Sequence, residues 1–474
     1  MPSAGGHVAV VGGGFAGVAC AAALAAHGVR VTLVERRASL GGRAWSFPDG
    51  PDGEAIDNGQ HLFAGAYRQT LELLERLGSR DRLSFQDALS VPLFDLRPGS
   101  RPRGTTAAAR PQRRAGLLGR LRGLGGFALL GAAARARLWG PLLALRGLGP
   151  APTDDISVED WLVRCGQRRA ARQLFWGPIA LAALNQDPRL ASSALFGAVL
   201  QETLLAGSEA ARLAVARVPL SELFAGLAPL VTRAGGAVRT QASCALVETE
   251  GGRAAAVRLK SGERLGADAV VLAVPPRALE PLLPPALASD PRFRDLADRL
   301  GGSAILSVHL WLDRQVMDGW MLGLLGTEFQ FVFCRDAFAE RPGRAGTHLV
   351  LCRSAADALC DRGPEALAAL ALEEVRRALP PARAARLERA RVVKERDATI
   401  AHTVGTLRHR PDGDTPLGGL FLAGDYLRTG LPATIESAVR SGTRTAALCR
   451  AYLTLATRPS PSRARSAASR LPPA

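Results

Sequence analysis

Lysine, tyrosine and methionine are scarce in this chain of 474 residues, and the patterns that define several protein classes are missing. Only Lys260 and Lys394 among the 60 Lys and Arg residues are lysine, and there are three tyrosines and three methionines. The seven cysteines are scattered and form no CxxC pair, which argues against a disulfide framework or a cysteine zinc site. The seven histidines show no HExxH or similar spacing, so we expect no metal.

The sequence also lacks a long apolar run, and we expect no secretory leader. No uncharged run reaches the roughly 18 residues that a bilayer-spanning helix needs. The first six residues carry no basic group of the kind that opens a signal peptide. The start of the sequence and the scattered cysteines together predict a cytoplasmic protein.

The net charge of +17 is unevenly distributed. Eleven arginines and no acidic residue lie between Asp95 and Asp154, and four more arginines follow Thr457. Aromatic residues make up only 5% of the chain and no nucleic-acid-reading motif is present, so we expect no nucleic-acid partner.

Part of the first arginine-rich stretch has an apolar helical face, formed by Leu117, Leu121, Leu124 and Ala128. Such a helix fits the interface of an anionic membrane, which predicts a peripheral protein on the inner face of the membrane. A lid helix packed on its own domain, with solvated arginines, fits equally well, and both interpretations can hold.

The N-terminus carries a complete dinucleotide-binding pattern. An apolar run from Val8 to Val11 precedes the glycine-rich turn that begins at Gly12, and an alanine-rich helix follows it. A second apolar run ends at Glu35, about 20 residues after the glycines, where an acid can accept the ribose hydroxyls. The order strand, glycine turn, helix, strand and acid predicts a nucleotide-binding βαβ unit.

Two further segments specify the nucleotide as FAD. The glycine pair Gly41 and Gly42 lets the backbone approach a diphosphate closely, and the guanidinium of Arg43 can donate paired hydrogen bonds to it. Near the C-terminus, an apolar run ends at Gly424 and Asp425, and a helix is expected with Pro432 in its first turn. The unpaired N–H groups of that helix start can face the flavin ring and favour its anionic reduced form.

The residues that we assign to the cofactor site come from all of these segments and from two neighbouring ones. They are Gly12, Gly14, Phe15, Ala16, Gly17, Glu35, Arg36, Gly42, Arg43, Gly59, His61, Cys244, Gly424, Asp425, Pro432, Ala433 and Thr434.

The chain is too long for one compact core, so we expect two intertwined domains. The predicted fold is α/β, with a glutathione-reductase-type FAD-binding Rossmann domain interleaved with an α+β substrate domain. We assign residues 1–90, 215–285 and 395–456 to the FAD domain, and residues 286–394 to the substrate domain. Residues 91–214 are expected to form its helical, membrane-facing part, and residues 457–474 a disordered tail.

Local patterns predict the elements within these domains. Antiparallel strands are expected over 237–247, 254–260 and 264–272, and a buried strand that starts at Asp268 and is stopped by Pro275 is expected under the nucleotide. Strands of a second sheet are expected over 303–312 and 329–334, and a helix over 365–379.

With these segments set together, the chain resembles the amine oxidase and phytoene desaturase superfamily of flavoproteins. The motifs that start at Asp57 (DNGQHLFAGAY), Trp176 (WGPIALAALN) and Thr429 (TGLPATIESAVRSG) look like one branch, the hydroxysqualene dehydroxylases of hopanoid biosynthesis. The resemblance covers nearly the whole chain and is weakest over about 96–150.

The resemblance implies reductive removal of an allylic hydroxyl from a C30 isoprenoid, yielding squalene. Hydride would come from reduced FAD, and the departing hydroxyl needs a proton donor. His61 and Asp57 are the catalytic candidates, with His61 as proton donor or substrate-positioning group. A loop that only shapes the flavin pocket through its backbone is an equally open interpretation.

The same resemblance implies partners and a pocket. The partners would be a polyisoprenoid lipid, an anionic membrane surface and other enzymes of squalene synthesis. Trp176, Ile179, Leu184 and Asn185 are candidates to line an apolar pocket, and each could equally be ordinary core. We interpret Glu436 as a capping carboxylate.

Three other functions remain open. A carotenoid or phytoene desaturase would use the same flavin oxidatively on a similar lipid. An amine oxidase would need aromatic side chains at the ring and often a lysine, and Lys260 falls in an expected hairpin. A noncatalytic flavin-binding lipid carrier is the third.

Overall fold

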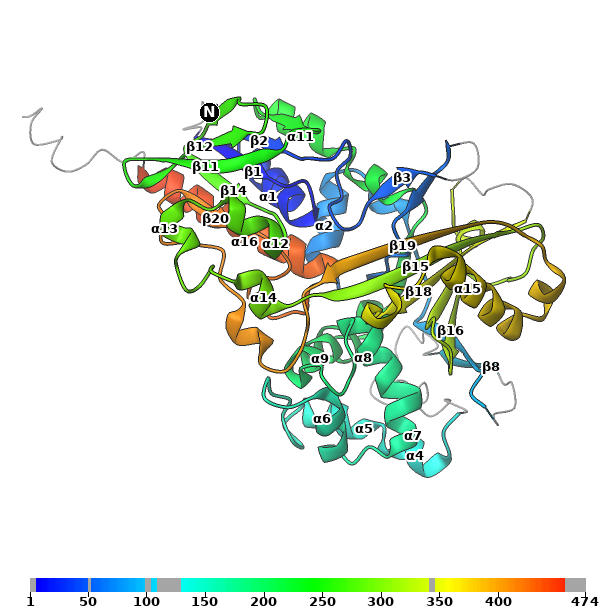
Figure 1. The fold of residues 1–474 in the computed structure, drawn as a ribbon. Coiled ribbons are helices and arrows are strands. Elements are labelled where there is room, and N and C mark those ends of the chain that lie inside the picture. Colours follow the sequence, from blue (N-terminus) through cyan, green and yellow to red (C-terminus); the bar gives the residue numbers. More distant parts are fainter. Residues whose placement is uncertain (1–5, 50–52, 99–103, 109–128, 341–345, 457–474) are drawn as a thin grey trace, which may run out of the picture.

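The computed structural model describes residues 6–49, 53–98, 104–108, 129–340 and 346–456. In Figure 1 a nucleotide-binding domain lies at the upper left, a second sheet with its covering helix at the right, and a helical subdomain at the bottom. The first and last parts of the chain meet in the nucleotide-binding domain. The fold predicted from the sequence is confirmed.

Five parallel strands form the central sheet of the nucleotide-binding domain, in the order β10-β2-β1-β14-β20. Their bounds are His7–Val11 (β1), Arg30–Val34 (β2), Ala237–Arg239 (β10), Ala269–Leu272 (β14) and Leu420–Leu422 (β20). Helix α1 (Phe15–Ala26) connects β1 to the parallel strand β2, as the glycine pattern predicts.

Helix α1 is buried almost throughout its length, because it packs with the sheet and with α16 (Ile435–Ala456). The two helices approach so closely that a Cβ on Gly442 would overlap the carbonyl oxygen of Ala16. The alanine-rich composition of α1 is therefore a packing requirement, and it brings the two ends of the chain together.

A three-stranded antiparallel sheet packs on the other face of the parallel sheet. Its strands are β11 (Cys244–Glu250), β12 (Arg253–Leu259) and β13 (Arg264–Gly266). The single strand predicted over 237–247 was wrong, because this range is divided between the two sheets. The range 264–272 is also divided: β13 lies in the antiparallel sheet, and the buried strand predicted from Asp268 is β14 of the parallel sheet. Gln241, at φ 55°, marks the turn between β10 and β11.

The second sheet has seven strands in the order β19-β15-β18-β17-β16-β7-β8. Their bounds are Leu387–Thr399 (β19), Ser303–Leu312 (β15), Thr347–Ser354 (β18), Phe331–Cys334 (β17), Met321–Leu325 (β16), Ser90–Asp95 (β7) and Gly104–Ala108 (β8). Helix α15 (Pro364–Ala378) packs on one face, against Leu306, Val308 and Leu310 of β15. Successive residues of a strand alternate between faces, so Ser307, His309 and Trp311 lie on the other face.

The helical subdomain lies below both sheets in Figure 1. Its helices are α4 (Ala132–Arg137), α5 (Trp139–Ala144), α6 (Val158–Arg164), α7 (Arg169–Ala171), α8 (Gly177–Leu184), α9 (Ser193–Leu200) and α10 (Ser208–Ala211). Trp161 and Trp176 each meet Phe196 edge to face, with ring centroids 6.3 Å apart.

Short elements connect these parts. They are β3 (Ser46–Pro48), β4 (Ala55–Asp57), β5 (Phe63–Ala64), α2 (Arg68–Arg76), β6 (Leu83–Phe85), β9 (Leu213–Ala216), α11 (Leu227–Arg233), α12 (Pro276–Leu279), α13 (Pro285–Ala288) and α14 (Leu296–Leu300). None of the helices within the described ranges combines the length and the apolar character that a bilayer crossing requires.

Three domain boundaries differ from the sequence-based division. Residues 395–399 were assigned to the FAD domain, yet they belong to β19 of the seven-stranded sheet. The range 91–214 was expected to be helical, yet it begins with strands β7 and β8 of the seven-stranded sheet. The range 286–300 was assigned to the substrate domain, yet Leu287, Phe293 and Leu296 pack in the core of the nucleotide-binding domain. The expected amphipathic helix around residues 117–128 and the tail 457–474 lie outside the described residues.

Asn185 joins the helical subdomain to the second sheet. It ends α8 in the left-handed conformation, at φ 48°. Its Nδ2 donates to the carbonyl of Ser303 at 3.1 Å and to Thr399 Oγ1 at 3.0 Å, and its Oδ1 accepts the Ala355 N–H at 2.7 Å. Asn tolerates this backbone conformation better than most residues, so one side chain ends the helix and fixes its position.

Candidate functional site

Two glycine turns stack on each other at the carboxyl end of β1. Gly14 in the first turn pairs with Gly41 in the second. A side chain on Gly17 would overlap the Gly12 carbonyl, and an ideal Cβ on Gly42, at φ 63°, would lie 2.9 Å from the Gly14 Cα. Both turns therefore present bare backbone, which fits a diphosphate.

Glu35 is buried at the end of β2, and both of its carboxylate oxygens accept backbone N–H groups. Oε2 accepts from Gly13 at 2.7 Å, and Oε1 accepts from Arg37 at 2.8 Å. These bonds hold the carboxylate at the carboxyl edge of the sheet, where a nucleotide ribose is expected.

Arg37, which the sequence pattern missed, turns towards the second glycine turn. Its Nη1 donates to the Gly42 carbonyl at 2.7 Å, and its guanidinium lies 4.4 Å from the centre of the Trp45 ring. Arg36, which we assigned to the cofactor site, is exposed.

Three other residues that we assigned to the cofactor site contact protein groups or are buried by them. Phe15 packs on Phe63 and Phe224, with ring centroids 6.4 and 4.9 Å away. Ala16 is buried where α1 meets α16. Cys244 begins β11, and burial raises the pKa of its thiol to about 11.

The two ends of the chain meet through an ion pair. Arg43 Nη2 lies 2.5 Å from Asp425 Oδ1, and Arg43 Nη1 donates to the Ala398 carbonyl at 3.1 Å. Gly424 is fixed beside them, because its N–H donates to Ser441 Oγ at 2.6 Å. The three segments that the sequence assigned to FAD therefore form one region.

Helix α16 begins with unpaired donors. Thr434 is its N-cap residue, because its hydroxyl accepts the Ser437 N–H at 3.2 Å. Pro432 lies before this cap and not in the first turn, so that detail of the prediction was wrong. In the described part of the chain, the N–H groups of Thr434, Ile435 and Glu436 donate to no acceptor. These N–H groups can donate to the anionic edge of a ligand, which fits a flavin.

Arg410 holds the backbone between Asp425 and this helix. Its buried guanidinium donates to the carbonyls of Asp425 and Leu431 at 2.6 Å each and of Tyr426 at 3.1 Å. Burial lowers its pKa to about 10, so it remains charged at neutral pH.

Glu436 does cap a helix, but not the one that contains it. Its carboxylate accepts the N–H groups of Gln69 and Thr70, at 3.2 and 3.0 Å, at the start of α2. It also accepts the Thr70 hydroxyl at 2.8 Å, and burial raises its pKa. The carboxylate thus ties α16 to α2.

Asp57 ends β4 and anchors the loop that follows it. Its Oδ1 accepts the Ser46 hydroxyl at 2.7 Å and the Leu220 N–H at 2.9 Å. Both bonds are buried, so the Asp57 carboxylate serves to hold the loop, and its charge reaches His61 through space.

His61 has one nitrogen engaged in this loop. Its Nδ1 lies 3.0 Å from the Gly59 carbonyl, which can only accept, so Nδ1 carries the proton in the neutral ring. Nε2 then keeps a free lone pair. Burial lowers the pKa of His61, against the opposing effects of the Gly59 carbonyl and the carboxylates of Asp57 and Glu395.

The loop rests on the face of the second sheet that α15 does not cover. Gly59 lies over Ser307, since an added Cβ would collide with the Ser307 hydroxyl. Beyond Ser307 this face carries an apolar cluster that includes Leu62, the neighbour of His61. Its other members are Val91, Leu213, Trp320, Met321, Phe331, Phe333, Val350 and Cys352.

A buried pair of histidines interrupts this apolar face. Nδ1 of His309 and Nε2 of His348 lie 3.0 Å apart, and His348 stacks on Trp311 at 4.4 Å. Burial lowers the pKa of His309 to about 3 and that of His348 well below its ordinary value, so both are neutral. No group of three potential metal ligands occurs in the described ranges.

The side chains that we expected to line a substrate pocket mostly lie buried in the protein interior. Trp176 is fully buried, and its indole N–H donates to Gln167 Oε1 at 2.9 Å. Leu184 is fully buried in the helical core, and Asn185 is engaged at the junction described above. Ile179 is partly buried against the same core.

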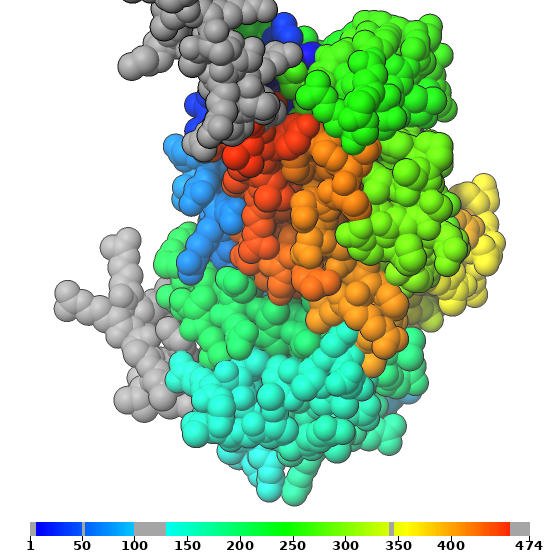
Figure 2. Space-filling model, turned by 90° about the vertical axis from the view of Figure 1, so that its left-hand side faces the viewer, coloured from blue at the N-terminus to red at the C-terminus, as the bar shows by residue number. Residues whose placement is uncertain are grey.

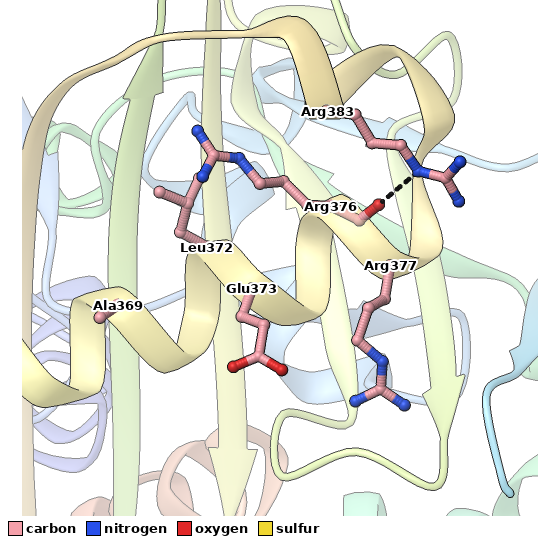
Figure 3. Close-up of a pocket in the computed structure, with 6 residues that line it drawn as sticks. All are labelled: Ala369, Leu372, Glu373, Arg376, Arg377 and Arg383. Atoms are coloured by element: carbon pink, nitrogen blue, oxygen red, sulfur yellow. Dashed lines mark hydrogen bonds between the residues drawn. The ribbon is translucent and has the colours of Figure 1, made fainter.

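Figure 3 shows a separate groove on the outer side of α15, with a volume of about 420 Å³. It is lined by Ala369, Leu372, Glu373, Arg376, Arg377 and Arg383. The Nε of Arg383 donates to the Arg376 carbonyl at 3.3 Å. Since α15 covers the sheet face opposite Ser307, this groove is not part of the candidate site.

Comparisons with known proteins agree with this geometry. The family described as "Flavin containing amine oxidoreductase" matches residues 15–450. Hydroxysqualene dehydroxylase of Rhodopseudomonas palustris is 33% identical over 450 residues, which cover 93% of this chain and 97% of that protein. The 15-cis-phytoene desaturase of Synechococcus elongatus is 28% identical, over 93% of this chain and 95% of that protein.

Solved structures share the fold at lower identity. An oxidoreductase from Methanosarcina mazei superposes with a TM-score of 0.71 at 16% identity, covering 92% of this chain and 99% of that one. A triple mutant of putrescine oxidase gives 0.70 at 19% identity, covering 94% and 99%.

The contact between Gly59 and Ser307 yields a test of the site. We expect Gly59→Ala to lower FAD content and to cost about 1–3 kcal/mol of stability, because the new methyl collides with the Ser307 hydroxyl. Adding Ser307→Ala removes that oxygen and leaves the neighbouring Cβ at an acceptable 3.4 Å. The double variant should recover FAD, measured by absorbance per protein. A double variant as poor as Gly59→Ala would show that another contact makes glycine necessary.

Proposed function

Because the chain belongs to the family of flavin containing amine oxidoreductases, we propose that it uses FAD to reduce hydroxysqualene to squalene. The observation that carries this proposal is the similarity, over almost the entire length of both proteins, to a hydroxysqualene dehydroxylase. The apolar cluster beside His61 supports it, since a C30 hydrocarbon needs an apolar wall next to the reacting carbon.

Bound FAD would supply, in its reduced form, the hydride that replaces the allylic hydroxyl, and the hydroxyl leaves as water. The chain supplies the rest. The glycine turns, Glu35 and the start of α16 hold the cofactor, and the apolar face of the second sheet excludes water from the lipid. In its imidazolium form His61 carries a second proton on Nε2 and delivers it to the departing hydroxyl, because Nδ1 is engaged with the Gly59 carbonyl.

The phytoene desaturase alternative has a specific observation behind it, the relative in Synechococcus elongatus. The two reactions run in opposite redox directions, so substrate and flavin state separate them. The putrescine oxidase likeness is below 25% identity and shows the fold alone.

A redox test distinguishes these functions. We expect the chemically reduced protein to convert hydroxysqualene to squalene without oxygen, and the oxidised protein to leave phytoene and putrescine unchanged. Products are identified by mass spectrometry and the flavin state by absorbance. Reduction of the flavin by phytoene or by an amine would contradict the proposal, and so would an intact hydroxysqualene pool.

His61 yields a pH prediction. Burial lowers its pKa below the ordinary 6.5, so at neutral pH the imidazolium is a minority form. If that form is the donor, kcat/KM rises about tenfold for each unit by which pH falls, until the pH reaches the pKa. His61→Gln should be slow, with no such rise and with normal FAD content. A full rate in His61→Gln, or a rate that falls with decreasing pH, would remove His61 as the donor.

Contact with an anionic membrane is a further part of the proposal. Leu143 and Leu148, 43% and 73% exposed, lie together at the end of α5, because the Leu148 N–H donates to the Leu143 carbonyl at 3.0 Å. Arg146 between them is also exposed. An exposed apolar pair beside a cation fits a lipid interface.

Vesicle binding tests this surface. We expect Leu148→Glu to weaken sedimentation with phosphatidylglycerol vesicles at least severalfold, because it places an anion in the interface. Leu455→Glu is the matched control, since Leu455 is 66% exposed on α16 in the nucleotide-binding domain. Equal binding of the two variants and the parent chain would exclude this contact.

A further inference from the structure

His402 lies between the helical subdomain and the turn that precedes α16. It follows β19, and its side chain is 1% exposed. No sequence motif marks it, and the cofactor assignments made from the sequence do not include it. Its ring nitrogens contact two segments that are far apart in the sequence.

The two contacts of His402 determine its protonation. Nδ1 lies 2.5 Å from the carbonyl oxygen of Leu184, at the end of α8, and a carbonyl can only accept. Nε2 lies 2.7 Å from the backbone nitrogen of Ala433, and a backbone N–H can only donate. The ring is therefore neutral, with its proton on Nδ1 and its lone pair on Nε2. Its burial, which lowers the pKa to about 4, agrees with this.

The bond to Ala433 orients the start of α16. The Ala433 N–H is taken up by His402 Nε2, and the next three N–H groups remain without an acceptor in the described part of the chain. Those groups and the helix dipole form the positive end that fits the flavin edge. A rotated Ala433 peptide would change where they point.

The bond to Leu184 links His402, and through it the start of α16, to the helical subdomain on the substrate side of the molecule. The backbone around His402 is joined to the helical subdomain, since the Ser192 N–H donates to the His402 carbonyl at 2.8 Å and the Val404 N–H to Leu190 at 3.0 Å. Figure 2 shows this segment, in orange, lying against the cyan and green helical region with the red α16 above it. Asn185, next to Leu184, fixes the same point to the second sheet.

We propose that His402 is a positioning residue that holds the Ala433 peptide from the end of α8, so that the free N–H groups of α16 are aimed at the flavin. The inference rests on the FAD part of the proposed function and not on the lipid. It predicts that loss of the bond to Ala433 weakens the preference of the site for the reduced, anionic flavin.

Asparagine and glutamine, whose side-chain amides differ in length, can replace His402 and test its two hydrogen bonds one at a time. In His402→Asn the side-chain nitrogen can occupy the place of Nδ1 and keep Leu184, while the acceptor for Ala433 is lost. In His402→Gln the side-chain oxygen can reach the place of Nε2 and accept the Ala433 N–H. Ser192→Ala is the matched control, because it removes the 2.6 Å bond between the Ser192 hydroxyl and Asp154 at the same junction without touching the turn.

The measurements are the FAD affinity of the apoprotein and the midpoint potential of the bound flavin, both taken without lipid. We expect His402→Asn to bind reduced flavin at least tenfold less tightly relative to oxidised flavin, which lowers the potential by about 30 mV. His402→Gln and Ser192→Ala should keep the parental potential.

A parental potential in His402→Asn, an equal loss in His402→Gln, or an equal loss in Ser192→Ala would overturn the proposal. If His402→Asn does not fold, His402→Gln decides, because it keeps the acceptor and must keep the potential. Since no lipid is present, failure of the hydroxysqualene assignment leaves these outcomes unchanged.

Discussion

The close packing of α1 against α16 is the constraint on which the site depends. One helix begins at residue 15 and the other at residue 435, and both need small residues where they meet. Their contact brings the first glycine turn, Arg43 and the Gly424–Asp425 turn into one region, and the ion pair between Arg43 and Asp425 lies across it. Neither end of the chain could form the flavin site alone.

The sequence predicted the parts of this arrangement that local rules determine. Glycines at fixed spacing, an acid at the end of β2 and an apolar run before Gly424 each have a local reason to occur, and all lie at the carboxyl edge of one sheet. The fold class and the cofactor followed from them. Local residue patterns also placed the strands β15 and β17 and the helix α15 within a few residues.

The parts that failed or were missed depend on contacts between distant residues. Glu436 looks like a cap for its own helix, but its carboxylate reaches α2, more than 360 residues away in the sequence. His402 and Arg410 carry no motif, and their partners become visible only when the chain has folded. Strand β7 joins the second sheet by pairing with β16, which lies far along the chain, and β8 is added to the sheet edge only through β7, so no local pattern placed this pair in the second sheet.

These long-range hydrogen bonds and the local glycine turns serve two different parts of the proposed site. In the proposed function the two glycine turns and Glu35 would hold the nucleotide, while His402, Arg410 and Asn185 would fix the flavin end relative to the substrate side. The most direct measurement of the central claim is an anaerobic single turnover of the reduced protein with hydroxysqualene. We predict one squalene for each FAD reoxidised, with both appearing at the same rate. Reoxidation without squalene, or squalene without reoxidation, would contradict the account.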